Sequence, residues 1–229
     1  MMLHCQIATT SDLSLVRMSI SRPNESIAAY KPLSHAYLTP LAIKLKTESG
    51  DMEALDKLFK FAREATSQLG EWCANQVWSL ALAEEEARKV ERKIERTFLA
   101  EKESRPIKVL DDGFSRLRGV QDIVHKWQFA RPSFEGNSLS PKVKLLLRYL
   151  DLIFEKPSAT KCIVFVKRRY SARLLGELSE RFGTPHIRIG LLIGTRYGDP
   201  GDLKISFRQQ VLTLMKFRKG ELNCLVGTN

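Results

Sequence analysis

From Lys161 onwards the chain alternates between apolar runs and amphipathic segments, and this alternation limits the possible folds more than any other feature. The run from Lys161 to Val166 (KCIVFV) is rich in β-branched residues, as a strand buried on both faces requires. The spacing predicts four further elements, in the order helix, strand, helix, strand: Ser171 to Gly183, Arg188 to Ile193, Ser206 to Lys219, and Leu222 to Gly227. Such alternation builds right-handed βαβ units, so we predict an α/β fold with a parallel sheet.

The loops that follow the predicted strands contain basic residues and glycine. Lys167 and Arg169 directly follow the first strand, and Gly194 and Thr195 open a Gly- and Asp-rich loop after the second. Ligands approach parallel α/β sheets at the carboxyl ends of the strands, so a ligand is expected at these loops. Arg169 can reach a phosphate, Lys167 adds charge, and backbone amides near Gly194 can approach an anion closely because glycine has no side chain. A solvated strand end and a simple turn are the competing interpretations.

The positive charge of the chain is concentrated in the same region. The net charge is +11 over 229 residues, and Lys161 to Asn229 contains 13 Lys and Arg against 5 Asp and Glu. A basic region of this kind suits a polyanionic partner. The four cysteines are far apart, and two lie in predicted strands, so we interpret them as reduced core thiols. No stretch has the length of a membrane span or a signal peptide, so we expect an intracellular protein, cytoplasmic or nuclear, with no membrane partner.

A helical block is predicted in the middle of the chain. Apolar residues from Met52 to Leu69 recur every three or four positions, with Gly70 as a stop, and a second stripe runs from Leu80 to Phe98 on one long helix. These helices are expected to pack antiparallel across a tight turn near Gly70, with a third, from about Phe114 to Trp127, closing the bundle. A solvated bundle face is the competing interpretation of the charged surface.

Two helices nearer the end of the chain are predicted to bury particular faces. Ser140 and Pro141 mark a helix start, with serine as the cap and proline at the first helical position. The buried face of this helix is predicted to consist of Leu145, Leu146, Tyr149, Leu150 and Ile153. The helix ending at Lys219 is predicted to bury Phe207, Val211, Leu214 and Phe217.

Several of these segments resemble successive motifs of the second RecA-like lobe of superfamily 2 helicases. They are IVFVKRRYSARLL, the glycine loop after LLIG, SFRQQVLTLMKFRKGELN and the final CLVGT. In particular, they resemble the helicase region of fungal Dicer-like proteins, and LHCQIATTSDLSLVRMSISRPNESIAAYKPL (3–33) is similar to the stretch by which those chains leave the first lobe. The resemblance implies a connector over 1–45, a helical insertion over 46–130 and a partial second lobe over 131–229. The expected fold is therefore α/β, with a partial RecA-like parallel sheet and an inserted antiparallel helical bundle.

The resemblance also implies roles for individual residues. Thr228 matches a threonine that touches the RNA backbone, and Gln210 matches a glutamine that helps to hold the strand. The chain departs from the family pattern at Gly227-Thr228-Asn229, where Ala-Thr-Ser is usual. The complete predicted RNA-binding set is Lys167, Arg169, Gly194, Thr195, Gln210 and Thr228.

For a longer parent protein, the resemblance implies ATP with Mg²⁺ or Mn²⁺ as cofactors and double-stranded RNA as the partner. Ribonuclease III domains of that parent would cut the RNA into small interfering RNAs for silencing and antiviral defence, alongside double-stranded-RNA-binding or Argonaute-pathway proteins. The chain itself has no GxxxxGK[ST] phosphate loop, no DExD/H-type acidic box and no ribonuclease III-like carboxylate pattern. We therefore expect part of a longer enzyme, with no catalytic residue, bound cofactor or metal site of its own.

Two other classes of function stay open at this point. One is a non-catalytic adaptor whose helical block, over residues 50–105, binds a protein partner. The other is a different superfamily 2 RNA helicase, such as an RNA sensor or a repair translocase; the helical insertion argues against the simpler DEAD-box enzymes. RNA binding that falls steeply with added salt would favour a helicase region, whereas capture of a protein without RNA affinity would favour the adaptor.

Overall fold

The computed structural model describes residues 4–8, 36–100, 107–155, 160–182, 186–194 and 205–228. Within these ranges the chain is a mixed α/β protein, mostly helical, with one four-stranded sheet. The elements, in chain order, are β1 (His4–Ala8), α1 (Pro40–Ser49), α2 (Glu53–Gln68), α3 (Glu71–Ala81), α4 (Glu84–Ala100), α5 (Ile107–Lys126), α6 (Pro141–Phe154), β2 (Lys161–Val166), α7 (Arg169–Phe182), β3 (Ile189–Leu192), α8 (Phe207–Lys219) and β4 (Cys224–Thr228).

The sheet has the strand order β1-β2-β4-β3. Strands β2, β4 and β3 run parallel, with β4 in the centre, while β1 pairs with β2 in the antiparallel direction. Val166 is the register partner of Thr228, and Leu192 is the partner of Gly227, so the three parallel strands end at the same edge. These pairings confirm the predicted parallel sheet. Each predicted strand forms within two residues of its expected ends. The antiparallel β1 was not predicted.

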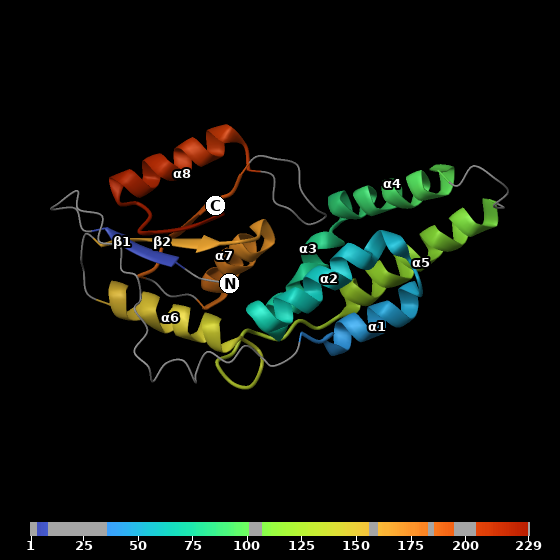
Figure 1. Cartoon of the computed structure of the whole chain (residues 1–229), viewed down its shortest axis with the longest axis horizontal. Coiled ribbons are helices and arrows are strands. Elements are labelled where there is room, and N and C mark those ends of the chain that lie inside the picture. Colours follow the sequence, from blue (N-terminus) through green and yellow to red (C-terminus); the bar gives the residue numbers. More distant parts are fainter. Residues whose placement is uncertain are drawn as a thin grey trace.

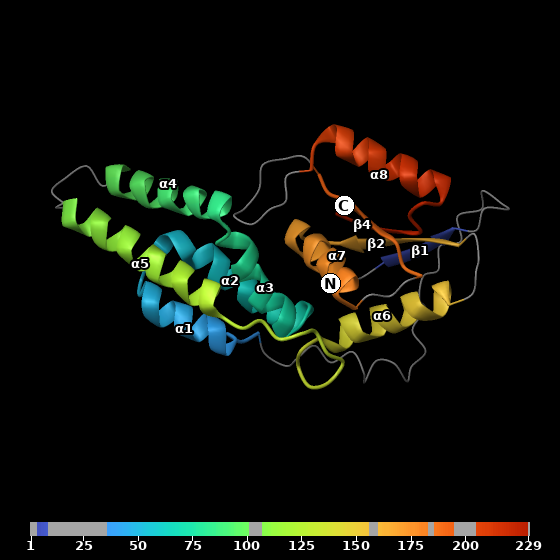
Figure 2. The ribbon, with the colours of Figure 1, turned by 180° about the vertical axis from the view of Figure 1, so that it is seen from behind.

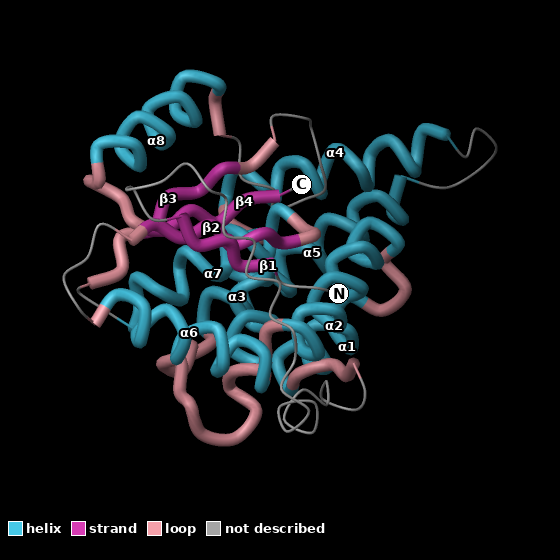
Figure 3. Tube along the Cα trace, turned by 60° about the vertical axis from the view of Figure 1, so that its left-hand side comes forward, coloured by secondary structure: helices cyan, strands magenta, loops and turns pink. Residues whose placement is uncertain are grey.

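Helices cover both faces of the sheet. Figures 1 and 3 show α8 on one face and α6 with α7 on the other. Helix α7 packs against β3 and β4, and α8 packs against β3. The close approach of α8 depends on Gly190, where a Cβ atom would lie 2.7 Å from Cγ2 of Thr213 and 2.7 Å from Cδ1 of Leu222. A larger residue at 190 would therefore push α8 away from the sheet.

Helices α1 to α5 form a separate layer beside the sheet, as Figure 2 shows from behind. The predicted turn at Gly70 is confirmed and joins α2 to α3. Phe59 and Trp78 lie at similar distances from Gly70 along the chain, and their ring centroids are 4.7 Å apart, which is the pattern of an antiparallel pair. Large side chains that are fully buried in this layer include Leu41, Leu45, Leu55, Leu58, Trp78 and Leu117.

The prediction of one long second helix is wrong in one respect. The structure divides it into α3 and α4 at Leu82 and Ala83. Leu82 departs from helical geometry with ψ 9° and is only 7% exposed, while Ala87 and Val90 of α4 are also buried. The break therefore allows both helices to turn apolar residues towards the core, a demand that a stripe along one helix does not reveal.

Helix α1 was not predicted, although Thr39 and Pro40 are a helix-start signal. The Thr39 hydroxyl accepts a hydrogen bond from the amide of Ala42 at 3.3 Å, and Pro40 occupies the first turn. The helix contributes Leu41 and Leu45 to the core of the helical layer. Helix α5 begins at Ile107, seven residues before the predicted start. The predicted domain boundaries stay predictions.

The predicted buried faces of α6 and α8 are partly wrong. In α6 the buried residues are Val143, Leu147, Leu150 and Phe154, whereas the side of the helix with Tyr149 and Leu152 is open to solvent. In α8, Phe207 is 75% exposed and Val211 is 38% exposed, while Leu214 and Phe217 are half-buried. Each helix has enough apolar residues for two candidate faces, so periodicity alone could not choose between them.

Candidate functional site

Four of the six predicted site residues lie at the end of the sheet where the parallel strands finish. We call this group, Lys167, Arg169, Gly194 and Thr228, the carboxyl edge. Thr228 is the last residue of β4 and lies beside Val166 in the adjoining strand. Lys167 follows Val166 directly and is exposed. The edge therefore brings a hydroxyl group and an ammonium group to the ends of two neighbouring strands.

Arg169 and Gly194 come together across the same edge. Arg169 is the first residue of α7, and Gly194 is the second residue after β3. A Cβ atom at Gly194 would lie 3.8 Å from Nη2 of Arg169, so the guanidinium group lies beside the bare backbone of the glycine. Arg169 and Gly194 therefore lie at the same edge of the sheet.

Gln210 lies in the first half of α8 and is half-buried. The amino group of Lys161, at the start of β2, donates a hydrogen bond to the carbonyl of Arg218 at 2.9 Å, so α8 ends at the opposite edge of the sheet. The beginning of α8 is therefore directed towards the carboxyl edge. Nε2 of Gln210 is buried without a hydrogen-bond partner among the described residues. Thr195, the sixth predicted residue, lies outside the described residues.

A further basic residue on the same helix, Arg208, was not among the predicted site residues. Arg208 is exposed in the first turn of α8, where Ser206 caps the helix by accepting a hydrogen bond from the amide of Gln209 at 3.2 Å. The capping box of Ser206 and Gln209 is a recognisable start signal, so the sequence could have placed Arg208 near the carboxyl edge. Its exposed guanidinium group is a further positive charge in the first turn of α8.

Arg168 lies between two residues of the carboxyl edge but turns to the helical layer. Its Nη2 is 3.2 Å from Oε2 of Glu64, and its Nε donates to Oε1 of Glu64 at 3.4 Å. The guanidinium carbon also lies 5.8 Å from the ring centroid of Phe61. The basic triplet Lys167-Arg168-Arg169 therefore has two kinds of residue: Arg168 contacts α2, while Lys167 and Arg169 belong to the carboxyl edge.

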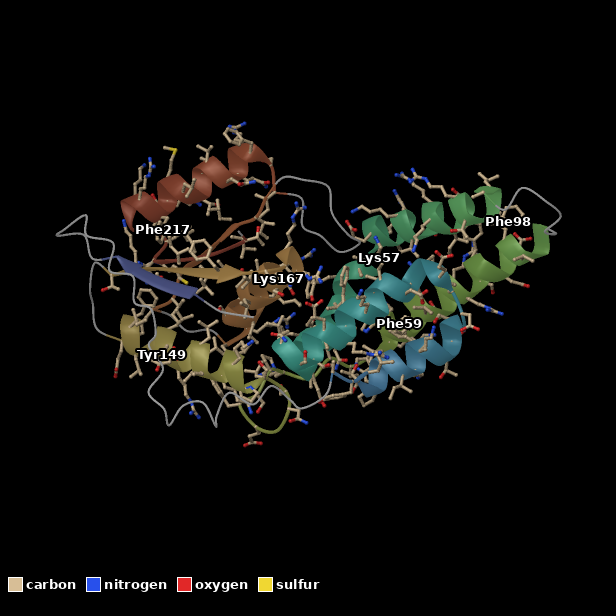
Figure 4. All side chains as sticks on the ribbon, viewed as in Figure 1. Lys57, Phe59, Phe98, Tyr149, Lys167 and Phe217 are labelled. Carbon is tan, nitrogen blue, oxygen red and sulfur yellow. The ribbon has the colours of Figure 1, made fainter. Side chains whose placement is uncertain are left out.

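The carboxyl edge faces the helical layer. Figures 1 and 2 both show β2 ending on the side of the sheet where α2 and α3 lie, and Figure 4 shows Lys167 at that end, with Phe217 at the opposite end. Helix α3 packs against α7, and the segment before α6 lies on the corner between α2 and α3. A ligand at the edge would therefore lie close to the helical layer.

The other reactive side chains do not form a second site in the part of the chain that the structure describes. Cys73, Cys162 and Cys224 are buried, and burial raises the pKa of the Cys73 thiol, so that thiol stays protonated. Across the described ranges there is no cluster of three or more His, Cys, Asp or Glu side chains suited to a metal ion. A membrane-crossing helix needs about 20 mostly apolar residues, and none of the helices in the described ranges meets that requirement.

Comparison with known proteins relates the whole chain to one family. No protein-family model matches. The chain is 41% identical over 229 residues to Dicer-like protein 1 of Aspergillus oryzae, and 39% identical over 228 residues to the proteins of the same name in Neosartorya fischeri and Aspergillus niger. Each match covers the full chain but only 15% of the relative, so the chain corresponds to a short segment of these proteins. The chain is therefore homologous, over its full length, to one segment of the fungal Dicer-like proteins.

Proposed function

We propose that this chain forms part of the helicase region of a Dicer-like protein and that its carboxyl edge binds the backbone of double-stranded RNA. In this proposal the sheet with α6, α7 and α8 is a partial RecA-like lobe, and the helical layer is the insertion. One observation carries the proposal: three parallel strands end together and assemble Lys167, Arg169, Gly194 and Thr228 at one edge. These groups are a donor set for phosphate and sugar oxygens.

The recognition expected at this edge is electrostatic and shape-dependent. An A-form duplex hides its base edges in a deep, narrow groove, so a protein contacts mainly phosphates and 2′-hydroxyl groups. Lys167 and Arg169 supply charge, Thr228 supplies a hydroxyl group, and Gly194 exposes backbone. None of these groups discriminates between bases, so we expect binding that is independent of RNA sequence.

The rest of the proposed activity belongs to a longer parent protein. ATP with Mg²⁺ or Mn²⁺ would drive the helicase, and ribonuclease III domains would cut the RNA into small interfering RNAs. Double-stranded-RNA-binding or Argonaute-pathway proteins would be further partners. The four residues of the carboxyl edge offer no carboxylates and do not fit a magnesium site, so we assign neither ATP nor metal contacts to them.

Salt-dependent binding of a blunt RNA duplex tests the proposal. We expect the logarithm of the association constant to fall linearly with the logarithm of the salt concentration. The double substitution Lys167→Ala with Arg169→Ala should lower affinity and reduce the steepness of that line by about two. The measurement is fluorescence anisotropy over a range of salt concentrations.

A matched control removes the same charge from the opposite edge of the sheet. Lys216 and Arg218 are exposed near the end of α8, where the carbonyl oxygen of Arg218 accepts the hydrogen bond from the Lys161 amino group. Substitution of both by alanine should change affinity much less than the edge variant does. Equal losses in the two variants would mean that binding follows net charge rather than the carboxyl edge. Absence of RNA binding at low salt would favour the adaptor, which should then capture a protein through residues 50–105.

A further inference from the structure

Helix α2 contacts the basic loop between β2 and α7 through two residues one turn apart. Glu64 forms the two-point ion pair with Arg168, at 3.2 Å and 3.4 Å. Phe61, three positions earlier, lies beneath the guanidinium group and has its ring centroid 5.2 Å from that of Tyr170. The two α2 side chains therefore contact residues 168 and 170 together, over a separation of 104 positions between Glu64 and Arg168.

The contact is partly shielded from water. The side chains of Arg168 and Glu64 are 36% and 28% exposed. The Tyr170 ring is half-buried, and burial, followed by the charge of Glu64, raises the pKa of its hydroxyl group. A bidentate pair between a guanidinium and a carboxylate also restricts orientation more than a single contact does. The contact is thus better suited to holding a loop in place than an exposed ion pair is.

The residues held by α2 flank a residue of the carboxyl edge. Arg169 lies between Arg168 and Tyr170, and Lys167 immediately precedes them. Arg169 and Tyr170 are successive residues in the first turn of α7, where side chains point about 100° apart, so fixing Tyr170 and the preceding Arg168 also sets the direction of Arg169. The side chain of Arg169 is accordingly found beside Gly194.

We infer that Glu64 and Phe61 of α2 are positioning residues for RNA binding, because they hold Arg168 and Tyr170 and thereby direct Lys167 and Arg169 to the carboxyl edge. This inference rests on the proposed function. It gives the helical layer a specific role, which is to set the geometry of the binding loop in the neighbouring lobe. A change in the orientation of α2 would then change RNA affinity without any contact between α2 and RNA.

The substitution Glu64→Gln separates positioning from simple electrostatics. Removal of a carboxylate near a basic surface should strengthen binding to a polyanion if only charge mattered. If Glu64 is a positioning residue, its replacement should weaken binding instead. We expect affinity for a blunt RNA duplex to fall about fivefold or more. Hydrogen–deuterium exchange of the peptide around residues 167–172 should become faster in the RNA-free variant.

The control is Glu84→Gln. Glu84 is also paired with an arginine, since its Oε1 lies 3.0 Å from Nη2 of Arg88, but both side chains are exposed on α4. We expect unchanged or slightly stronger RNA binding and unchanged exchange around residue 168. A charge swap, Glu64→Arg with Arg168→Glu, provides the rescue: each single change should weaken binding, and their combination should recover most of the affinity.

The outcomes distinguish this inference from the proposed function. If Lys167→Ala with Arg169→Ala leaves RNA affinity unchanged, both are overturned. If that variant loses affinity while Glu64→Gln binds as well as the parent or better, the inference alone is overturned. A swap that binds no better than the weaker single variant, or unchanged exchange in Glu64→Gln, also overturns it.

Discussion

Gly70 occupies a position that other residues cannot adopt without strain. Its φ of +108° lies in a region that L-residues rarely enter, and a Cβ atom would lie 2.5 Å from both Cα of Leu139 and the carbonyl oxygen of Ser138. Gly70→Ala should therefore lower the free energy of unfolding by about 1–3 kcal/mol or more, measured by denaturant titration. Gly136 is the matched control, since its φ is +53° and nothing lies within 4 Å of its Cβ position. A loss at Gly136 as large as that at Gly70 would contradict the steric explanation.

Tyr37 should make stability depend on alkaline pH. Burial, followed by a hydrogen bond to the Glu71 carboxylate and its charge, raises the pKa of Tyr37 from 10.0 to about 12. Because the folded pKa is raised, the stabilisation is fully present below pH 10 and is lost as the pH rises through the folded value. We expect the difference in free energy of unfolding between the parent and Tyr37→Phe, measured by denaturant titration, to shrink as the pH rises from 10 to about 12. A difference that stays constant with pH would contradict the assignment.

At the scale of single elements, α8 permits a comparison between two phenylalanines. Phe207 is 75% exposed, whereas Phe217 is half-buried and has the Lys161 amino group 5.5 Å from its ring centroid. Phe207→Ala should change the free energy of unfolding by less than about 0.5 kcal/mol, whereas Phe217→Ala should cost about 2 kcal/mol. Denaturant titration of both variants gives the comparison. Equal costs would mean that Phe207 and Phe217 are both buried, as periodicity alone predicted.

The elements also show where local patterns are sufficient. The run KCIVFV formed β2 at its predicted residues, and Ser140 caps α6 as predicted. These patterns succeed because strand burial and helix capping involve neighbours in sequence. The break between α3 and α4 was not predictable in this way, because it reflects the burial of Leu82 among residues of other helices.

At the scale of the whole molecule, the contacts of α3 with α7 and of Glu64 with Arg168 should couple the unfolding of the helical layer to that of the sheet. The three tryptophans lie in the helical layer or at its end, whereas Cys162 and Cys224 are buried in the sheet. We expect tryptophan fluorescence and thiol reactivity, followed in a variant without Cys5 and Cys73, to report the same denaturant midpoint. Separate midpoints would mean that the two layers unfold independently.

The candidate site was predictable in part for a topological reason. Once the strands are parallel, the residues that follow β2 and β3 and the end of β4 must meet at one edge, which brings Lys167, Gly194 and Thr228 together. The pairing of Arg168 with Glu64 had no counterpart in the sequence, because the two residues are 104 positions apart and each resembles an ordinary surface charge.

The sequence by itself determined the alternation of strands and helices, the concentration of positive charge beyond Lys161 and the relationship to Dicer-like proteins. Each of these depends on local periodicity, composition or residue identity, which the chain carries before it folds. Only the tertiary structure decided which faces of α6 and α8 are buried and which arginine of the triplet turns to α2. Such choices depend on side chains that are distant in sequence and compete for the same space and charge, and folding alone brings them into contact.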